Sequence, residues 1–206
     1  MLIVSICAFI TSYNNGSTTY SLGSKDYYET IWDGGGTDEI TMSGSSNAVI
    51  DLRAATLEYE AGGAGFVSYN ADAKGGYTIA NGVVIENAKG GGGNDTITGN
   101  YTNNIIYGGS GAGVKDILTG NLGADIFISC IADATTDLSL ADTITDFYNG
   151  TDKIGLEDRF FSDLSFSNDG GGTKIVDNIS SKILFWLDGI DSSLIDSEDF
   201  ITTDFV

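Results

Sequence analysis

Residues 90–98 read GGGGNDTIT, and variants of this nine-residue unit follow one another up to residue 128. The four units are 90–98 (GGGGNDTIT), 99–107 (GNYTNNIIY), 108–119 (GGSGAGVKDILT) and 120–128 (GNLGADIFI). They share the pattern G-G-x-G-x-D-x-U-x, in which U is apolar, and the third unit carries three extra residues. A glycine-rich linker or a simple hairpin would not keep an acid and an apolar residue in phase, so the repeat predicts a regular coil.

Each position of the unit has a physical reason. The first six residues suit a tight turn, because glycine reaches backbone conformations that other residues avoid. The last three suit a strand whose middle side chain alone faces inward. Those middle residues are apolar in every unit: Ile97, Ile106, Leu118 and Phe127. Successive strands then lie on opposite sides of a narrow core, so alternate turns stack on one edge. Stacked turns gather the carbonyl and carboxylate oxygens that a hard cation with six to eight ligands requires.

The composition is that of an acidic, β-rich protein. The chain has 206 residues, 29 glycines, no histidine and no proline, and 9 basic against 29 acidic residues give a net charge of −20. That charge repels phosphate backbones and anionic lipid, so we expect no nucleic-acid partner and no membrane insertion. A divalent cation is a more suitable partner for a protein with this negative charge. No segment keeps a helical period over a normal helix length, so we predict an all-β fold.

Three zones follow one another along the chain. Residues 14–89 alternate strand candidates with Gly/Asn/Ser turns, residues 90–128 hold the repeat, and residues 129–206 are more acidic. The strand candidates are IWD, AVIDL, GFVSY, GYTIA and GVVIEN in the first zone and KILFWL in the third. The opening MLIVSICAFI is too short to span a bilayer and lacks the marks of a signal peptide, which leaves a buried strand or a truncated helix. Cys7 and Cys130 could form one disulfide, which no framework of cysteines supports.

The nonapeptide resembles the repeat of RTX proteins, and the longer stretch 14–128 resembles the C-terminal domain of serralysins, which are secreted bacterial zinc metalloproteases. The matching segments are TIWDGGGTDEITMSG (30–44), AVIDLRAATLE (48–58), GVVIENAKGGGGNDTITGN (82–100), GNLGADIFI (120–128) and ADTITDFYNGTDKIGL (141–156). The resemblance implies a parallel β-roll that binds several calcium ions and is capped by flanking strands. It also implies three parts: a lead-in over residues 1–13, a calcium-binding roll domain over residues 14–156, and a C-terminal β cap with an export signal over residues 157–206.

Carried over position by position, the resemblance implies four calcium sites. The first takes Asn14, Gly16, Thr18, Asp33, Gly35 and Asp38; the second takes Gly36, Asp38, the Val84 carbonyl and the Glu86 carboxylate; the third takes Gly91, Gly93, Asp95, Gly108, Ser110 and Asp116; the fourth takes Asn100, Thr102, Asn104, Gly120, Leu122 and Asp125. The insertion at 112–115 puts the partner turn of the third site in question. Asn104 offers a neutral oxygen, which predicts a weaker or empty fourth site. Asp133 and Asp142 are candidates for a further ion.

The extreme C-terminus reads Asp204-Phe205-Val206, an acid followed by apolar residues. It resembles the ending of serralysins, which leave the cell through a type I (ABC) exporter by means of an uncleaved C-terminal signal. The resemblance therefore implies an extracellular protein with such an exporter as a partner, and we expect a monomer. A simple terminal edge strand is the alternative interpretation of these three residues.

Catalysis by the known histidine-dependent routes is excluded within this chain. The zinc motif of serralysins, H-E-x-x-H-x-x-G-x-x-H, needs three histidines, and Ser or Cys triads need one, whereas the chain has none. The segment GGSGA at 108–112 lacks the final glycine of G-x-S-x-G, and no P-loop is present. The 29 acids make chance carboxylate pairs certain, so no glycosidase can be argued.

Three functional hypotheses remain. The first is a non-catalytic domain for calcium-induced folding and type I secretion of a serralysin-like metalloprotease or related hydrolase, of which this chain would be a fragment or an internal start. The second is a stand-alone secreted RTX adhesin or glycan-binding protein, in which Tyr20, Tyr27, Tyr28 and Trp32 would contact the target. The third is an enzyme that uses carboxylates alone.

Overall fold

The computed structural model describes residues 15–23, 25–111 and 113–203, which form an all-β molecule. These ranges contain seventeen strands and four 3₁₀ helices, the latter at Leu138–Leu140, Phe161–Asp163, Ser192–Leu194 and Ser197–Asp199, and they contain no α-helix. None of their helices is long and apolar enough to cross a membrane. Our expectations for residues 1–13, including a disulfide from Cys7, and for residues 204–206 lie outside the described residues.

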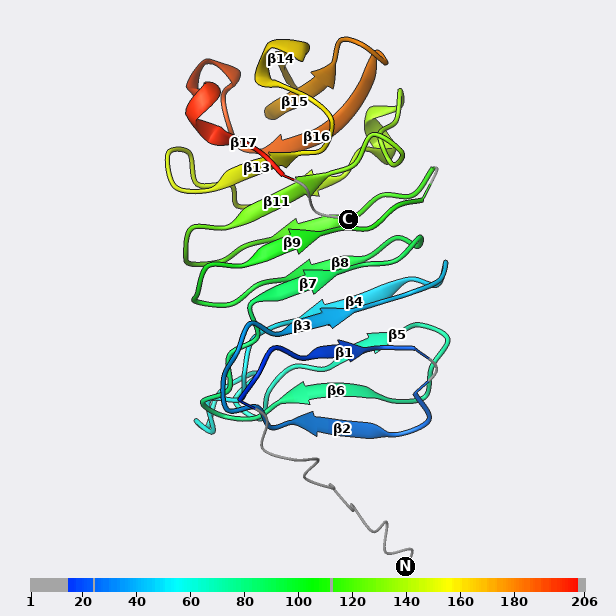
Figure 1. Cartoon of the computed structure of the whole chain (residues 1–206), viewed down its shortest axis with the longest axis vertical. Coiled ribbons are helices and arrows are strands. Elements are labelled where there is room, and N and C mark those ends of the chain that lie inside the picture. Colours follow the sequence, from blue (N-terminus) through cyan, green and yellow to red (C-terminus); the bar gives the residue numbers. More distant parts are fainter. Residues whose placement is uncertain (1–14, 24, 112, 204–206) are drawn as a thin grey trace, which may run out of the picture.

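The strands form two sheets that face each other along the long axis of the molecule (Figure 1). The seven-stranded sheet has the order β1 (Thr19–Ser21), β3 (Glu39–Thr41), β7 (Asn87–Lys89), β9 (Ile105–Tyr107), β11 (Ile126–Ser129), β13 (Lys153–Leu156) and β17 (Phe200–Thr202). The ten-stranded sheet has the order β14 (Leu164–Asp169), β15 (Gly172–Asp177), β16 (Lys182–Asp188), β12 (Thr143–Ile144), β10 (Ile117–Thr119), β8 (Thr96–Thr98), β4 (Ala48–Asp51), β5 (Ser68–Asn70), β6 (Gly76–Ile79) and β2 (Tyr28–Ile31).

The repeat forms the parallel β-roll that the sequence predicts. Strands β8 and β10 pair in parallel in one sheet, and β9 and β11 pair in parallel in the other, so two units make one coil. The four inward residues of the units are fully buried between the sheets: Ile97, Ile106, Leu118 and Phe127. Such a narrow core leaves room for one apolar side chain per three-residue strand.

A hairpin interrupts the roll before the repeat. Strand β5 pairs antiparallel with both β4 and β6, and β6 pairs in parallel with β2, so β5 and β6 lie between β2 and β4 in the ten-stranded sheet. The candidate GVVIEN (82–87) is wrong as a strand, because β7 begins only at Asn87. A turn at residues 81–82 precedes residues 83–86, which lie outside any strand: Gly82 has a φ of 80°, and Val83 donates a backbone hydrogen bond to the Ala80 carbonyl.

Flanking strands cap the end of the roll near the C-terminus. Strands β14, β15 and β16 form an antiparallel meander, and β16 pairs in parallel with β12. Strand β17 pairs in parallel with β13, so both sheets continue into the cap. The rings of Phe161, Phe166 and Phe200 pack together with centroids 5.2–5.7 Å apart. The cap therefore covers strand edges that would otherwise be open to other chains.

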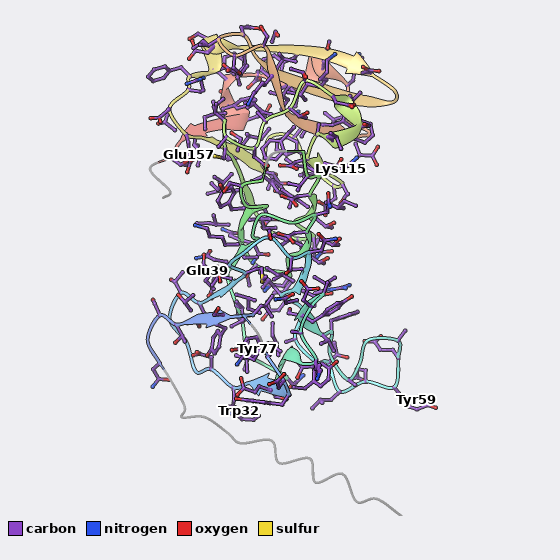
Figure 2. The ribbon with its side chains drawn as sticks, turned by 90° about the vertical axis from the view of Figure 1, so that its right-hand side faces the viewer. Trp32, Glu39, Tyr59, Tyr77, Lys115 and Glu157 are labelled. Carbon is purple, nitrogen blue, oxygen red and sulfur yellow. The ribbon has the colours of Figure 1, made fainter. Side chains whose placement is uncertain are left out.

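Figure 2 shows the molecule turned by 90°, with Tyr77 between the two sheets and Tyr59 on a loop that projects to one side. The turns that join the strands lie along the edges of the roll. The acid of a repeat, or Asn104 in the second unit, stands two residues before the inward apolar residue, as Asp95 does before Ile97. This spacing fixes the acid in the turn, at the entrance to the strand.

Candidate metal centres

Acidic side chains form a ladder along the edge that leads into the ten-stranded sheet. Ala48 donates its backbone N–H to Asp95 Oδ1 at 2.6 Å, Asp95 donates its own N–H to Asp116 Oδ1 at 2.7 Å, and Asp116 donates to Asp142 Oδ1 at 2.8 Å. Each carboxylate thus accepts a hydrogen bond from the turn of the preceding coil. The stacking of the strands therefore holds these acids in a row.

A second ladder follows the opposite edge. Thr18 donates its backbone N–H to Asp38 Oδ1, and Asp38 donates to Glu86 Oε2, both at 2.8 Å. Farther along, Asn104 donates to Asp125 Oδ1 at 2.8 Å, and Asp125 donates to Asp152 Oδ1 at 3.0 Å. Both edges therefore show the same hydrogen-bond pattern, in which a side-chain oxygen of one turn accepts a backbone N–H of the preceding turn.

Three of these carboxylates each keep one buried oxygen without a hydrogen-bond partner: Asp38 Oδ2, Asp116 Oδ2 and Asp125 Oδ2. A buried carboxylate oxygen with no donor is costly, because it has lost water and gained nothing. Carboxylate and carbonyl oxygens are also the ligands that calcium takes in proteins. The residues present therefore fit a bound calcium ion.

The pKa values of these acids point the same way. Burial, followed by the charges of Asp95 and Asp133, raises the pKa of Asp116 to about 8. Burial, followed by the charges of Asp152 and Asp146, raises the pKa of Asp125 to about 7. Without a counter-charge, ionising these groups at neutral pH therefore opposes folding. A bound cation would remove that cost.

The two turns of the first candidate site lie face to face. A Cβ at Gly36 would lie 2.6 Å from the Gly16 carbonyl carbon, so glycine is required where the backbones meet. Thr18 reaches Asp38 as described above, and Gly35 donates its N–H to Asp33 Oδ1 at 3.1 Å. The predicted ligand Asn14 lies outside the described residues.

The second candidate site joins Asp38 to Glu86 from a distant part of the chain. Besides the bond to the Glu86 carboxylate, the Asp38 carbonyl accepts the Glu86 N–H at 3.2 Å. Burial and the charges of Asp33 and Glu86 raise the pKa of Asp38. Gly36 belongs to the turn of Asp38, and Val84 belongs to the turn of Glu86.

The two turns of the third candidate site stack despite the insertion at 112–115. Ser110 donates its N–H to the Gly91 carbonyl at 2.9 Å, and Gly91 donates to Asp95 Oδ2 at 2.7 Å. A Cβ at Gly108 would lie 2.3 Å from Asp116 Oδ2. Asp116 reaches its place in the ladder because β10 returns to register with β8 after the extra residues.

Gly93 also packs against a turn from an earlier part of the chain. A Cβ at this position would lie 2.6 Å from the Ser46 carbonyl oxygen, and the next residue, Asn94, donates its N–H to Asn47 Oδ1 at 2.9 Å. The turn 43–47 is thus a neighbour of the repeat that our sequence reasoning missed. It carries no acid, which hides it from a search for calcium motifs.

The fourth candidate site contains an amide that the protein itself satisfies. Asn104 Oδ1 accepts the Asn100 N–H at 2.8 Å, and Asn104 Nδ2 donates to the Glu86 carbonyl at 2.9 Å. Leu122 donates its N–H to the Asn100 carbonyl at 3.2 Å, which stacks the two turns. The other members of the site are Thr102, whose N–H reaches Asn100 Oδ1 at 2.9 Å, Gly120, and Asp125.

Asp133 and Asp142 join Asp116 in a compact cluster. One carboxylate oxygen from each of the three lies within 4.8 Å of the others. Burial and the neighbouring carboxylates raise the pKa of Asp142. Asp133 also accepts the Gly111 N–H at 3.0 Å, so the cluster is tied to the turn of the third site.

Sequence reasoning missed two acids of the second ladder. Asp146 accepts the N–H groups of Gly120 and Asn121, each at 2.8 Å, and Asp152 accepts that of Asp125. A signal was present, because Asp152 stands two residues before the buried Ile154, in the position of the repeat acid. The longer spacing between these coils hid it.

Comparison with known families gives one match over most of the chain. The family model described as "Peptidase M10 serralysin C terminal" matches residues 14–183. Serralysin G of Dickeya chrysanthemi is 38% identical over 190 residues, which cover 83% of this chain and 36% of that protein. Metallopeptidase AprA of Pseudomonas marginalis is 38% identical over 111 residues, which cover 46% of this chain and 21% of that protein. The chain thus spans about a third or less of these relatives.

Among solved structures, the chain is similar to the solution structure of the AlgE6R3 subunit from the Azotobacter vinelandii mannuronan C5-epimerase. The sequence identity is 17% and the TM-score is 0.34, over 93% of this chain and 81% of that one.

Proposed function

Because this chain belongs to the serralysin C-terminal family, we propose that it is a non-catalytic domain that binds several calcium ions and folds with them as part of a secreted, serralysin-like metalloprotease or related hydrolase. The observation that carries the proposal is the set of three buried carboxylate oxygens without partners in the stacked turns. We assign catalysis to a part of the parent protein outside this chain, which has no histidine.

The proposed mechanism is a folding switch. In the absence of calcium, the stacked carboxylates repel one another, and the glycine-rich turns lose much conformational entropy on folding. A calcium ion would supply the positive charge and the coordination that these oxygens lack. Because only the folded turns assemble a complete ligand set, the free energy of binding contributes directly to folding. We expect half-saturation near 10⁻⁴–10⁻³ M, as in extracellular modules.

Circular dichroism during a calcium titration tests this switch. The full chain should lose its β-sheet signal in chelator and regain it cooperatively as calcium is added. Magnesium is the matched control, because it demands a rigid octahedral site and should restore little structure. A β-sheet signal that chelator leaves unchanged contradicts the proposal.

We propose further that the protein leaves the cell through a type I (ABC) exporter, with residues 157–206 serving as the cap and the export signal and residues 14–156 as the calcium-binding domain. Support comes from the family alone. A bacterial host with a serralysin exporter should secrete the full chain and retain a variant whose last three residues are replaced by Gly-Ser-Gly. Equal secretion of both variants contradicts the assignment of the signal to this end. We expect a monomer in calcium, which light scattering measures.

A further inference from the structure

A single row of neighbouring residues crosses the outer face of the ten-stranded sheet. Parallel and antiparallel register places these six residues side by side on successive strands: Tyr28 (β2), Gly76 (β6), Tyr69 (β5), Val49 (β4), Thr96 (β8) and Ile117 (β10). We call this row the uncharged strip, because no member carries a charge at neutral pH. With strands about 4.8 Å apart, the strip is about 24 Å long.

The aromatic end of the strip is open to solvent. The exposed fraction is 63% for Tyr28 and 41% for Tyr69. Between them lies Gly76, which is buried and has no side chain that would separate the two rings. The rings are two strands, or about 10 Å, apart. Exposed aromatic rings beside the outermost strand of a sheet are a liability for aggregation unless they serve a partner.

Hydroxyl groups accompany the rings. Thr30 of β2 and Thr78 of β6 lie one row away on the same face and share a hydrogen bond of 3.0 Å. Thr96 and Ile117 continue the strip, and both are exposed. The face therefore combines exposed rings with hydroxyl donors and acceptors. A charged pair stands beside the strip: Asp51, two residues after Val49 on β4, contacts Arg53 at 2.6 Å, so the two charges offset each other.

The charge of the strip decides what it can bind. The chain carries a net charge of −20, so an acidic partner is repelled, and a basic partner would be drawn to the acids of other surfaces. The outer face of the seven-stranded sheet differs, since Glu39, Lys89 and Lys153 project from it (Figure 2 labels Glu39). An uncharged ligand with apolar faces and hydroxyl edges therefore matches the strip better than it matches the outer face of the seven-stranded sheet.

We infer that the uncharged strip binds a neutral, β-linked polysaccharide, whose sugar rings would stack on Tyr28 and Tyr69 while its hydroxyl groups meet the threonines. The polysaccharide would run across the strands, along the long axis of the protein. The distance between the two tyrosines is comparable to the length of a disaccharide. Of the aromatic residues that the sequence suggests for glycan contact, Tyr20 is excluded, because it is half-buried and its hydroxyl donates to Asp33 at 2.5 Å. This inference does not depend on whether the protein is part of a protease.

The test is depletion of the full chain, in calcium, by microcrystalline cellulose and by chitin, with alginate beads as the acidic control. We expect retention on an uncharged polymer that survives high salt, and none on alginate. Tyr28→Ala and Tyr69→Ala should each weaken retention roughly tenfold, because each removes one stacking ring. Tyr59→Ala and Tyr148→Ala are matched controls, since both residues are exposed elsewhere and should change nothing.

Three results would overturn the inference. Two are no retention on either uncharged polymer and equal retention of the strip variants and the native chain. The third is a dimer that Tyr28→Ala dissociates, because the strip would then be a contact between copies. Circular dichroism and the melting temperature show that each variant is folded. If alanine disturbs the strands, Tyr28→Thr and Tyr69→Thr place a residue with high strand propensity there and also remove the ring.

Discussion

At the scale of single residues, the acids of the turns show what the fold requires. Asp38, Asp116 and Asp125 each hold a backbone N–H with one oxygen and leave the other buried without a donor. If these side chains served only to tie two turns together, asparagine would serve as well as aspartate. Its amide nitrogen could donate a further hydrogen bond. Asn104 does so at the equivalent position, with its amide bonded to the Glu86 carbonyl. The unpartnered carboxylate oxygens therefore support the proposed cation, since the turn alone does not require them.

Asp116→Asn should act in opposite directions with and without calcium. In chelator, the free energy of unfolding should rise by about 1–3 kcal/mol, because a buried group that resists ionisation is replaced by a neutral one. In calcium, affinity should fall roughly 10–100-fold, because one charged ligand is lost. Urea unfolding and calorimetric titration measure the two effects. Asp188→Asn, at an exposed position, is the control, and a change of the same sign in both conditions contradicts the prediction.

At the scale of elements, the turns tolerate only residues that let neighbouring coils approach. Gly108→Ala should destabilise the calcium-loaded protein by about 2 kcal/mol or more, because the new Cβ meets Asp116 Oδ2 at 2.3 Å and Cγ at 2.9 Å. Gly23→Ala is the control, since its nearest neighbour, Ser21 Oγ, is 3.8 Å away. Equal melting temperatures for the two variants would show that the turn relaxes without cost.

Much of this architecture could be predicted from the sequence. Over residues 90–128, the period of nine residues predicts strands β8 to β11, their inward residues and the stacking of alternate turns, because each unit contacts only its neighbours. The hairpin of β5 and β6 could not be predicted, since its place between β2 and β4 depends on contacts between segments far apart in the sequence. Asp146 and Asp152 were not predicted for a related reason. Their coils are longer than nine residues, although the fold brings both acids into the same ladder.

The cap is a separate test of the elements, because its aromatic cluster lies beyond the repeat. Phe200→Ala should lower the free energy of unfolding by about 3–5 kcal/mol, since it removes a buried ring that touches both Phe161 and Phe166. Phe160→Ala, at an exposed residue, should have little effect. Denaturant unfolding in calcium measures both. A small loss at Phe200 would mean that the cap packs too loosely to close the roll.

At the scale of the whole molecule, the net charge of −20 and the stacking of the turns act together. A roll places its turns in two rows, so acids that are far apart in the sequence become neighbours along each edge. Every coil added to the roll therefore adds a carboxylate to an existing row. If the proposed ions bind, folding without them would become harder as the roll grows, whereas folding with them would gain a ligand set at each step.

The pH dependence of stability follows from these rows, and its sign depends on calcium. In chelator, Asp116 and Asp125 have folded-state pKa values of about 8 and about 7, above the ordinary value of 3.8. The folded state then holds more protons than the unfolded one, so stability is greatest near pH 4. It falls by about 1.4 kcal/mol per pH unit for each group until the folded-state pKa is reached. In calcium the trend reverses, because protons compete with the ion for the same oxygens, and stability rises with pH over this window. Urea unfolding from pH 4 to pH 9, with and without chelator, measures both slopes. Parallel slopes in the two conditions would mean that these carboxylates do not bind the ion.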